Sequence, residues 1–321
     1  MSVRLLKENV RDEKQMRAYY SETIVKMIED GKPVIALDAD LMRAVGLLPY
    51  RKNHPDRIFD CGIAEANMMG VAAGLSAEGF VPFAHSFAAF ASRRAFDQVY
   101  MSGAYAKLNV KVVGSDPGVC AALNGGTHQA NEDMALMTAV PDMTVVEPSD
   151  SVMLLDLMPQ IADTYGMFYL RLFRLESIKL YEPGSTFELG KAVMLRDGSD
   201  ATIIACGIEV AEAVKAADML AGEGLSIRVL DMFTVKPIDR DAVLAAAADT
   251  GAIVTAENHN VIGGLGDAVA RVLCAECPTP LGRIGIQDIF GEVGSTPMLM
   301  ERFGLTAKDI AAKVRETIAR K

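Results

Sequence analysis

The sequence has 321 residues, of which 50% are apolar and 23% are charged, and its formal net charge at pH 7 is −10. This length suits two domains better than one core, and the composition predicts a packed interior instead of extensive disorder. The acidic balance argues against sequence-independent binding to nucleic acid or to an anionic membrane, because both need clustered Lys and Arg. Small molecules and other proteins remain as partners.

No apolar run reaches the length of a membrane span, and the N-terminal stretch lacks the apolar centre of a signal peptide. The five cysteines, an odd number, fit a reducing compartment, so we expect a cytoplasmic protein. Cys274 and Cys277 form a CxxC pair. No second pair accompanies it, and we expect no metal site.

In the first half of the chain, short β-rich runs alternate with helical patterns. Strands are predicted at 33–40, 79–85, 109–115, 143–148 and 166–172. Helices are predicted at 12–30, 64–78, 87–107, 131–138 and 149–163. This alternation predicts a mostly parallel sheet with helices on both faces.

A less regular segment follows at 174–200, and its Pro183, Gly184 and Gly198 are typical of a linker. The alternation then restarts, with strands predicted at 201–207, 226–232, 252–258 and 281–286 and helices at 209–222, 239–249 and 264–276. The sequence therefore predicts an α/β protein of two doubly wound domains, at 12–173 and, smaller, at 201–321.

Four residues in the first half could carry chemistry, and each also has a structural explanation. Glu65 stands at the head of a predicted helix, where the helix dipole favours an acid whether or not it is catalytic. Phe87 and Phe90 are three apart on one helical face, a spacing more typical of core. His128, in GGTHQ, fits a helix start or a catalytic group equally well.

Other candidates gather where predicted strands end. The polar, glycine-rich loop at 114–133 follows a strand, and ligands bind at the carboxyl ends of strands in open α/β sheets. Arg171 and Arg174 end a strand at the same edge, although scattered cations such as these and Arg17 more often form surface ion pairs. The IGGLG run (262–266) is weak evidence for a phosphate cradle, because a tight turn needs the same residues.

Together these motifs resemble the C-terminal half of a transketolase, which consists of the domain that binds the pyrimidine ring of thiamine diphosphate and the C-terminal domain. The resemblance runs from about residue 12 to the end, and several motifs occur in the family's order and spacing. They are ALDAD (36–40), HPDRIFDCGIAEANM (54–68), SFAAFASRRAFDQV (86–99), GSDPGV and NGGTHQ within 114–129, VVEPSD (145–150) and ENHNVIGGLGDAV (257–269).

The resemblance implies a thiamine diphosphate site. The family's acid at the position of Glu65 hydrogen-bonds N1′ of the aminopyrimidine, and its proton favours the tautomer that deprotonates C2 of the thiazolium. Phe90 matches the aromatic residue that stacks on the pyrimidine, and Phe87 lies beside it. Asp40 and Ile63 are implied as further cofactor contacts.

Substrate contacts are implied as well. His128 matches a histidine that faces the substrate and assists proton transfer at its hydroxyls. Arg17 and Arg174 match cations that hold the substrate's terminal phosphate.

Around that phosphate the chain departs from the family pattern. Asp116 stands where a phosphate-facing histidine is common, Ala44 replaces a phosphate-contacting serine, and an acidic Glu-Asp-Gly run becomes Leu123-Asn124-Gly125. Asp116 and Asn124 are therefore implied substrate contacts. We expect an anionic tail to be accepted, with a preference shifted toward an unusual sugar phosphate or a differently charged analogue.

The sequence contains no GDG and no metal motif of the kind that family enzymes use to hold the diphosphate. The resemblance therefore implies a separate N-terminal subunit that carries the diphosphate together with Mg²⁺ or Ca²⁺. With this partner we expect an α2β2 heterotetramer, or else a dimer of the chain itself.

The resemblance predicts the β subunit of a transketolase, which transfers a two-carbon ketol unit from a ketose or ketose phosphate to an aldose. The β subunit of a 2-oxo-acid dehydrogenase and a deoxyxylulose-phosphate-synthase-like enzyme use the same cofactor, but SFAAF and GGTHQ favour a transketolase. A non-catalytic subunit that binds no cofactor is a further alternative, which the presence of Glu65 with Phe90 opposes.

Overall fold

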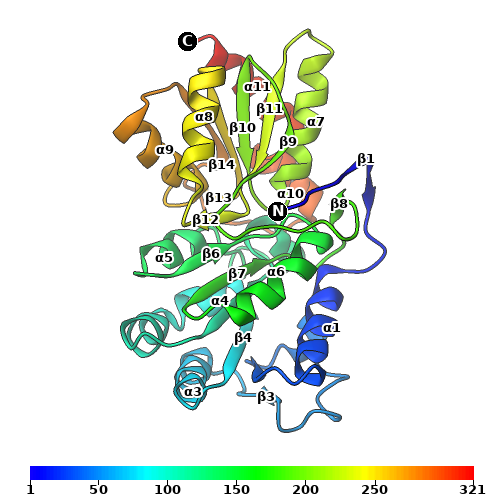
Figure 1. The fold of residues 1–321 in the computed structure, drawn as a ribbon, viewed down its shortest axis with the longest axis vertical. Helices are drawn as coiled ribbons and strands as arrows, with labels where there is room; N and C mark the ends of the chain where they lie inside the picture. Colours follow the sequence, from blue (N-terminus) through cyan, green and yellow to red (C-terminus); the bar gives the residue numbers. More distant parts are fainter.

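The computed structural model describes residues 1–321, apart from the side chain of Asn9. Two α/β units are stacked along the long axis of the molecule, and the N-terminus lies near the junction between them (Figure 1). The C-terminus lies at the far end of the second unit. We call the unit built on the seven-stranded sheet the first unit and the unit built on the five-stranded sheet the second unit.

The sheet of the first unit has the strand order β12-β6-β7-β5-β4-β2-β3. β12 pairs antiparallel with β6, and the other neighbouring strands pair in parallel. The strands in chain order are β2 (Val34–Asp38), β3 (Ile58–Asp60), β4 (Val81–Phe87), β5 (Lys111–Ser115), β6 (Thr144–Val146), β7 (Phe168–Leu172) and β12 (Thr234–Lys236). β2, β4, β5 and β7 are buried along their whole length, as expected for parallel strands covered on both faces.

All five helices predicted for the first unit are present, but two short helical segments, α2 (Met42–Val45) and η2 (Gly118–Asn124), were not predicted. The segment predicted as one helix at 87–107 divides into a short α-helix and a π-helical segment, because apolar spacing alone does not separate the two helix types. The helical segments are α1 (Met16–Glu29), α2 (Met42–Val45), α3 (Glu65–Ala77), α4 (Ala88–Arg93), η1 (Gln98–Tyr105), η2 (Gly118–Asn124), α5 (Asp133–Ala139) and α6 (Ser151–Asp163).

The second unit has the strand order β14-β13-β10-β11-β9, with β9 (Val193–Arg196) antiparallel at one edge. Its remaining strands are β10 (Ala201–Ala205), β11 (Ile227–Asp231), β13 (Ile253–Asn260) and β14 (Leu281–Ile286). Its helices are α7 (Glu209–Ala221), α8 (Arg240–Thr250), α9 (Leu265–Glu276), α10 (Thr296–Phe303) and α11 (Ala307–Ile318). The helices α10 and α11 were not predicted from the sequence. Thr306 and Asp309 nevertheless form a capping box, which marks the start of α11.

The segment predicted as a less regular linker, at 174–200, contains two short strands. They are β8 (Ile178–Tyr181), which pairs antiparallel with β1 (Leu5–Arg11), and β9 (Val193–Arg196), which extends the second sheet. These short strands are stabilised by partners far away in the sequence, a context that local patterns do not contain.

Arg171, at the end of β7, is fully buried and joins the two units. Its Nε and Nη2 donate to the two carboxylate oxygens of Asp133 at 2.8 and 3.1 Å, and its Nη1 donates to Glu147 at 2.7 Å. Nη2 also donates to the backbone carbonyl of Asn258 in β13 at 2.7 Å. Burial alone would raise the pKa of Asp133, but the charge and hydrogen bonds of Arg171 bring it below its usual value.

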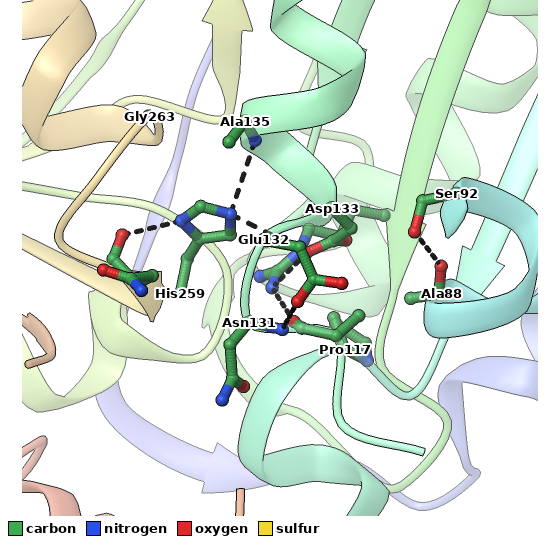
Figure 2. Close-up of polar contacts among 12 residues, drawn as sticks. Ala88, Ser92, Pro117, Asn131, Glu132, Asp133, Ala135, His259 and Gly263 are labelled. Atoms are coloured by element: carbon green, nitrogen blue, oxygen red, sulfur yellow. Dashed lines mark hydrogen bonds and ion pairs between the residues drawn. The ribbon is translucent and has the colours of Figure 1, made fainter. Parts of the chain in front are cut away.

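His259 in β13 closes the same junction from the second unit. Figure 2 shows its ring beside Asp133 and pointing toward Ala135 near the start of α5. Nδ1 donates to the backbone carbonyl of Asn260 at 2.7 Å, and Nε2 accepts from the backbone N–H of Ala135 at 3.4 Å. Burial lowers the pKa of His259 to about 4, so the ring is neutral near pH 7. It packs between the two units as an uncharged side chain.

Within the described residues, the chain has no helix with the length and apolar character that crossing a membrane would require.

Candidate functional site

The site lies at the carboxyl ends of the parallel strands in the first unit. β3 and β4 flank β2 on opposite sides, so the strand order reverses around β2. In open α/β sheets, ligands bind in the crevice at such a switch point. Glu65 begins the helix that follows β3, and Phe87 ends β4. Asp116 directly follows β5.

Glu65 is a buried acid at the start of α3, only 4% exposed. Its Oε1 accepts from Arg94 Nη1 at 2.8 Å and lies 3.5 Å from the hydroxyl of Ser86. A buried carboxylate needs such partners, because its desolvation is costly. The acid that the sequence singled out therefore faces a cation, the guanidinium of Arg94.

Phe87, Phe90 and His128 form one aromatic cluster. The ring centroids of Phe90 and His128 are 5.0 Å apart, those of Phe87 and His128 are 5.9 Å apart, and those of Phe87 and Phe90 are 5.9 Å apart. The two phenylalanines come from β4 and α4, while His128 comes from the loop after η2. The structure thus brings together three residues that the sequence separates by up to 41 positions, from 87 to 128.

His128 does not open the following helix, contrary to one of its two sequence interpretations. It lies in a turn, and α5 begins only at Asp133. Its Nδ1 is 2.9 Å from the hydroxyl of Thr127. Partial burial and the nearby charges of Arg94 and Arg93 lower its pKa, so the imidazole is neutral near pH 7 and can accept or donate a proton.

Arg94 belongs to this site but was not predicted from the sequence. Its guanidinium carbon lies 3.7 Å from the centroid of the Phe90 ring, and the same group donates to Glu65. The SFAAFASRRAFDQV motif contains Arg94, but only the fold brings the end of α4 against the start of α3. A flat, polar group therefore fits between the acid and the aromatic face.

A second set of charges lies at the ends of β5 and β7. Asp116 is 1% exposed, and its Oδ2 lies 3.0 Å from Arg174 Nε. Burial raises the pKa of Asp116 to about 6, and the charge of Arg174 opposes that rise. The guanidinium carbon of Arg174 is also 5.7 Å from the Phe87 centroid, which connects this set to the aromatic cluster.

Arg17 belongs to the same charged set. Its Nη1 donates to the backbone carbonyl of Ala44 at 2.9 Å, and its charge is one of those that oppose the raised pKa of Asp116. Asp116, which the resemblance implies as a substrate contact, is therefore an ion-pair partner of Arg174 in this structure.

Beneath both sets, three buried side chains connect adjacent strands. His85 Nδ1 is 2.6 Å from Asp38 Oδ2, and His85 Nε2 is 2.9 Å from Ser115 Oγ. All three are at most 3% exposed. This order of residue types is that of a hydrolase triad, but Ser115 is inaccessible to substrate. The arrangement therefore fixes the strand ends that carry the site.

The remaining predicted residues lie at the edge of the crevice. Asp40 has a left-handed φ of 62°, and its N–H donates to Asp60 at 3.0 Å. Ile63 is 74% exposed. Asn124 is exposed at the end of η2.

The IGGLG turn does not hold an external anion. The carboxylate of Glu257 accepts from the backbone N–H groups of Leu265 and Gly266, at 2.7 and 2.8 Å, and so occupies the start of α9 itself. The tight-turn interpretation is therefore correct. Among the described residues, no group of three or more His, Cys, Asp or Glu side chains is arranged to hold a metal ion.

Comparison with known proteins identifies the family of the chain. Residues 12–177 match the family model of the transketolase pyrimidine-binding domain, and residues 190–310 match that of the transketolase C-terminal domain. A 6-deoxy-6-sulfo-D-fructose transketolase subunit, SqwH, from Clostridium sp. (strain MSTE9) is 52% identical over 310 residues, which are 97% of this chain and 96% of that protein.

Two further relatives extend the comparison. A putative transketolase C-terminal section from Methanocaldococcus jannaschii is 40% identical over 306 residues, covering 94% of this chain and 96% of that protein. A solved structure of a split-gene transketolase, an inactive β4 tetramer, superimposes with a TM-score of 0.88 at 42% identity, covering 96% of this chain and 99% of the other. The chain belongs to the transketolase family, as a transketolase subunit made of the pyrimidine-binding and C-terminal domains.

Proposed function

We propose that this subunit, assembled with an N-terminal transketolase subunit, transfers a two-carbon ketol unit between sugars whose far end carries a sulfonate group. The observation that carries this proposal is the buried ion pair between Asp116 and Arg174. It reduces the positive charge where the family binds a phosphate. In this proposal the site belongs to a pyrimidine-binding domain at 12–173, separated by 174–200 from a C-terminal domain at 201–321.

Transketolases use thiamine diphosphate, and three residues of the aromatic site fit its aminopyrimidine ring. Glu65 offers a buried carboxyl to a ring nitrogen, and Phe90 with Phe87 offers an aromatic face. The fit rests on the flat guanidinium of Arg94, which already contacts both Glu65 and Phe90. When bound, the cofactor supplies the carbon nucleophile for ketol transfer.

The chain's own residues then hold the reacting groups and move protons. Glu65 would share a proton with the ring nitrogen, and the neutral imidazole of His128 would exchange a proton with substrate hydroxyls. Asp40, Ile63 and Asn124 line the rim of the crevice, the first two toward the cofactor and the third toward the substrate. Exclusion of water from this crevice strengthens each of these hydrogen bonds.

The diphosphate and its Mg²⁺ or Ca²⁺ belong to the partner subunit in this proposal. Two relatives support a divided enzyme, since one is named as a subunit and the other is a split-gene transketolase whose β4 tetramer is inactive. We infer an α2β2 assembly that works in the cytoplasm, which the five free cysteines support.

The net charge of the residues around the far end of the substrate favours a substrate group that carries a single negative charge. Arg17 and Arg174 contribute two positive charges and Asp116 one negative charge, so the set is singly positive when Asp116 is ionised. A sulfonate carries one negative charge at neutral pH, whereas a phosphate ester carries about 1.5 to 2. The relative with 52% identity is named for a sulfonated ketose, in agreement with this balance.

We expect the assembled enzyme to show a higher kcat/KM for a sulfonated ketose than for the matched phosphate ester. In Asp116→Asn, the preference should shift toward the phosphate by about fivefold or more. A unit charge about 4 Å from the carboxylate contributes on the order of 1–4 kcal/mol, and the dianion feels this repulsion more strongly.

Two controls separate charge from structural damage. An uncharged ketose should react equally well with the wild type and with Asp116→Asn. Asp142→Asn, a substitution at an exposed position, should leave the ratio of kcat/KM for the sulfonated and phosphorylated ketoses unchanged. A wild type that prefers the phosphate, with the same preference in Asp116→Asn, would show that Asp116 does not set tail selectivity.

A further inference from the structure

Arg94 occupies the position between Glu65 and Phe90 in the subunit on its own. One face of its guanidinium lies over the Phe90 ring, 3.7 Å from guanidinium carbon to centroid, and its Nη1 donates to Glu65 Oε1 at 2.8 Å. A guanidinium is planar and presents N–H donors at its edge. It thus makes the two kinds of contact that an aminopyrimidine would make with the same residues, stacking and an edge hydrogen bond.

Glu65 and Arg94 differ in their exposure to solvent. Glu65 is 4% exposed and needs a partner, whereas the side chain of Arg94 is 47% exposed. Arg94 is also the C-terminal cap residue of α4, next to the transition into η1. An ion pair open to solvent on one side contributes little net stability, and the long arginine side chain can turn outward into water.

We propose that Arg94 is a placeholder for the cofactor, which satisfies Glu65 and covers Phe90 until the pyrimidine displaces it. This inference rests on the proposed roles of Glu65 and Phe90. The cofactor binds only the fraction of molecules in which Arg94 has turned out, so its apparent affinity is lowered by that fraction. The placeholder keeps a buried acid paired in the subunit before assembly, at the expense of cofactor affinity.

The adjacent arginine provides a matched control. Arg93 has nearly the same exposure, 43%, but it pairs with Glu132 and donates to the backbone carbonyl of Gln129 at 3.0 Å. It carries the same charge one residue away and contacts neither Glu65 nor Phe90 in this structure. Any effect that requires competition for the cofactor site should therefore be confined to Arg94.

The test is a calorimetric titration of thiamine diphosphate, with Mg²⁺, into the assembled two-subunit complex. Arg94→Ala should bind the cofactor roughly three- to tenfold more tightly than the wild type, because it removes one half-exposed ion pair and one cation–π contact from the competing state. Arg94→Lys, which keeps the charge but loses the flat face, should lie between them. Arg93→Ala should match the wild type.

The isolated subunit gives a second readout of opposite sign. There Arg94→Ala should lower the thermal unfolding midpoint, because Glu65 loses its partner. A residue with only a structural role would weaken stability and cofactor binding together. Unchanged or weaker cofactor binding by Arg94→Ala, with normal binding by the wild type, overturns the placeholder alone. Failure of every complex, wild type included, to bind the cofactor overturns the proposed site and the placeholder with it.

Discussion

Replacement of Glu65 by glutamine is expected to lower ketol transfer by the assembled enzyme about 10²- to 10⁴-fold, the usual effect of removing a positioned acid–base group. Glutamine keeps the size of the side chain and can still accept from Arg94 Nη1. It cannot deliver and take back a proton. The thermal midpoint of the isolated subunit should therefore change much less than the turnover number, which is measured at saturating cofactor and substrate.

The same helix contains the control for this substitution. Glu78 is the exposed C-terminal cap residue of α3, so Glu78→Gln changes the same functional group far from the crevice. It should leave turnover near the wild-type rate. Near-normal turnover in Glu65→Gln would mean that Glu65 serves only as a first-turn acid that stabilises α3.

Replacement of Arg171 by methionine is expected to lower the free energy of unfolding by about 3–5 kcal/mol, because it leaves buried carboxylates without their cation. Asp133 and Glu147 would lose their charged partner, and the carbonyl of Asn258 would lose its link across the junction. Arg171→Lys should also be destabilised, since a single ammonium cannot reproduce the fork of donors. Urea unfolding at a fixed subunit concentration measures the difference.

A surface arginine provides the comparison. Arg196 pairs with Asp218 on the exposed side of β9, and Arg196→Met should change the free energy of unfolding by less than about 1 kcal/mol. If Arg171→Met unfolds at the same urea concentration as Arg196→Met, the network does not hold the two units together.

Much of the fold could be predicted from local patterns. The buried strands β2, β4, β5 and β7 are short, mostly apolar runs flanked by helical stretches, and that alternation is typical of parallel sheets covered on both faces. The restart of the alternation after residue 200 likewise indicated a second sheet. These elements are determined by residues close together in the chain.

Elements that depend on distant partners could not be predicted. β12 is three residues long and belongs by sequence to the second half, yet it pairs with β6 at the edge of the first sheet. β8 forms against β1, across some 170 residues. Neither strand has an alternating pattern long enough to mark it, since its stability comes from the strand beside it.

The candidate site also has a part that local motifs identify and a part that only the tertiary structure creates. Glu65, Phe90 and His128 could be named because several motifs occur together in order. The contact of Arg94 with Glu65 and the ion pair of Arg174 with Asp116 arise only where separate loops meet at the edge of the sheet. The sequence indicated which residue types are present, but which cation neutralises which acid is decided by tertiary structure.

Ketol transfer from a sulfonated ketose to an aldose, measured for the purified chain alone and after mixing with an N-terminal transketolase subunit, tests the proposed two-subunit enzyme most directly. Thiamine diphosphate and Mg²⁺ are present in both samples. We expect no turnover by the chain alone, turnover by the mixture, and loss of that turnover when thiamine diphosphate is omitted. Full ketol transfer by the single chain, or a mixture that remains inactive on both sulfonated and phosphorylated ketoses, would contradict this expectation.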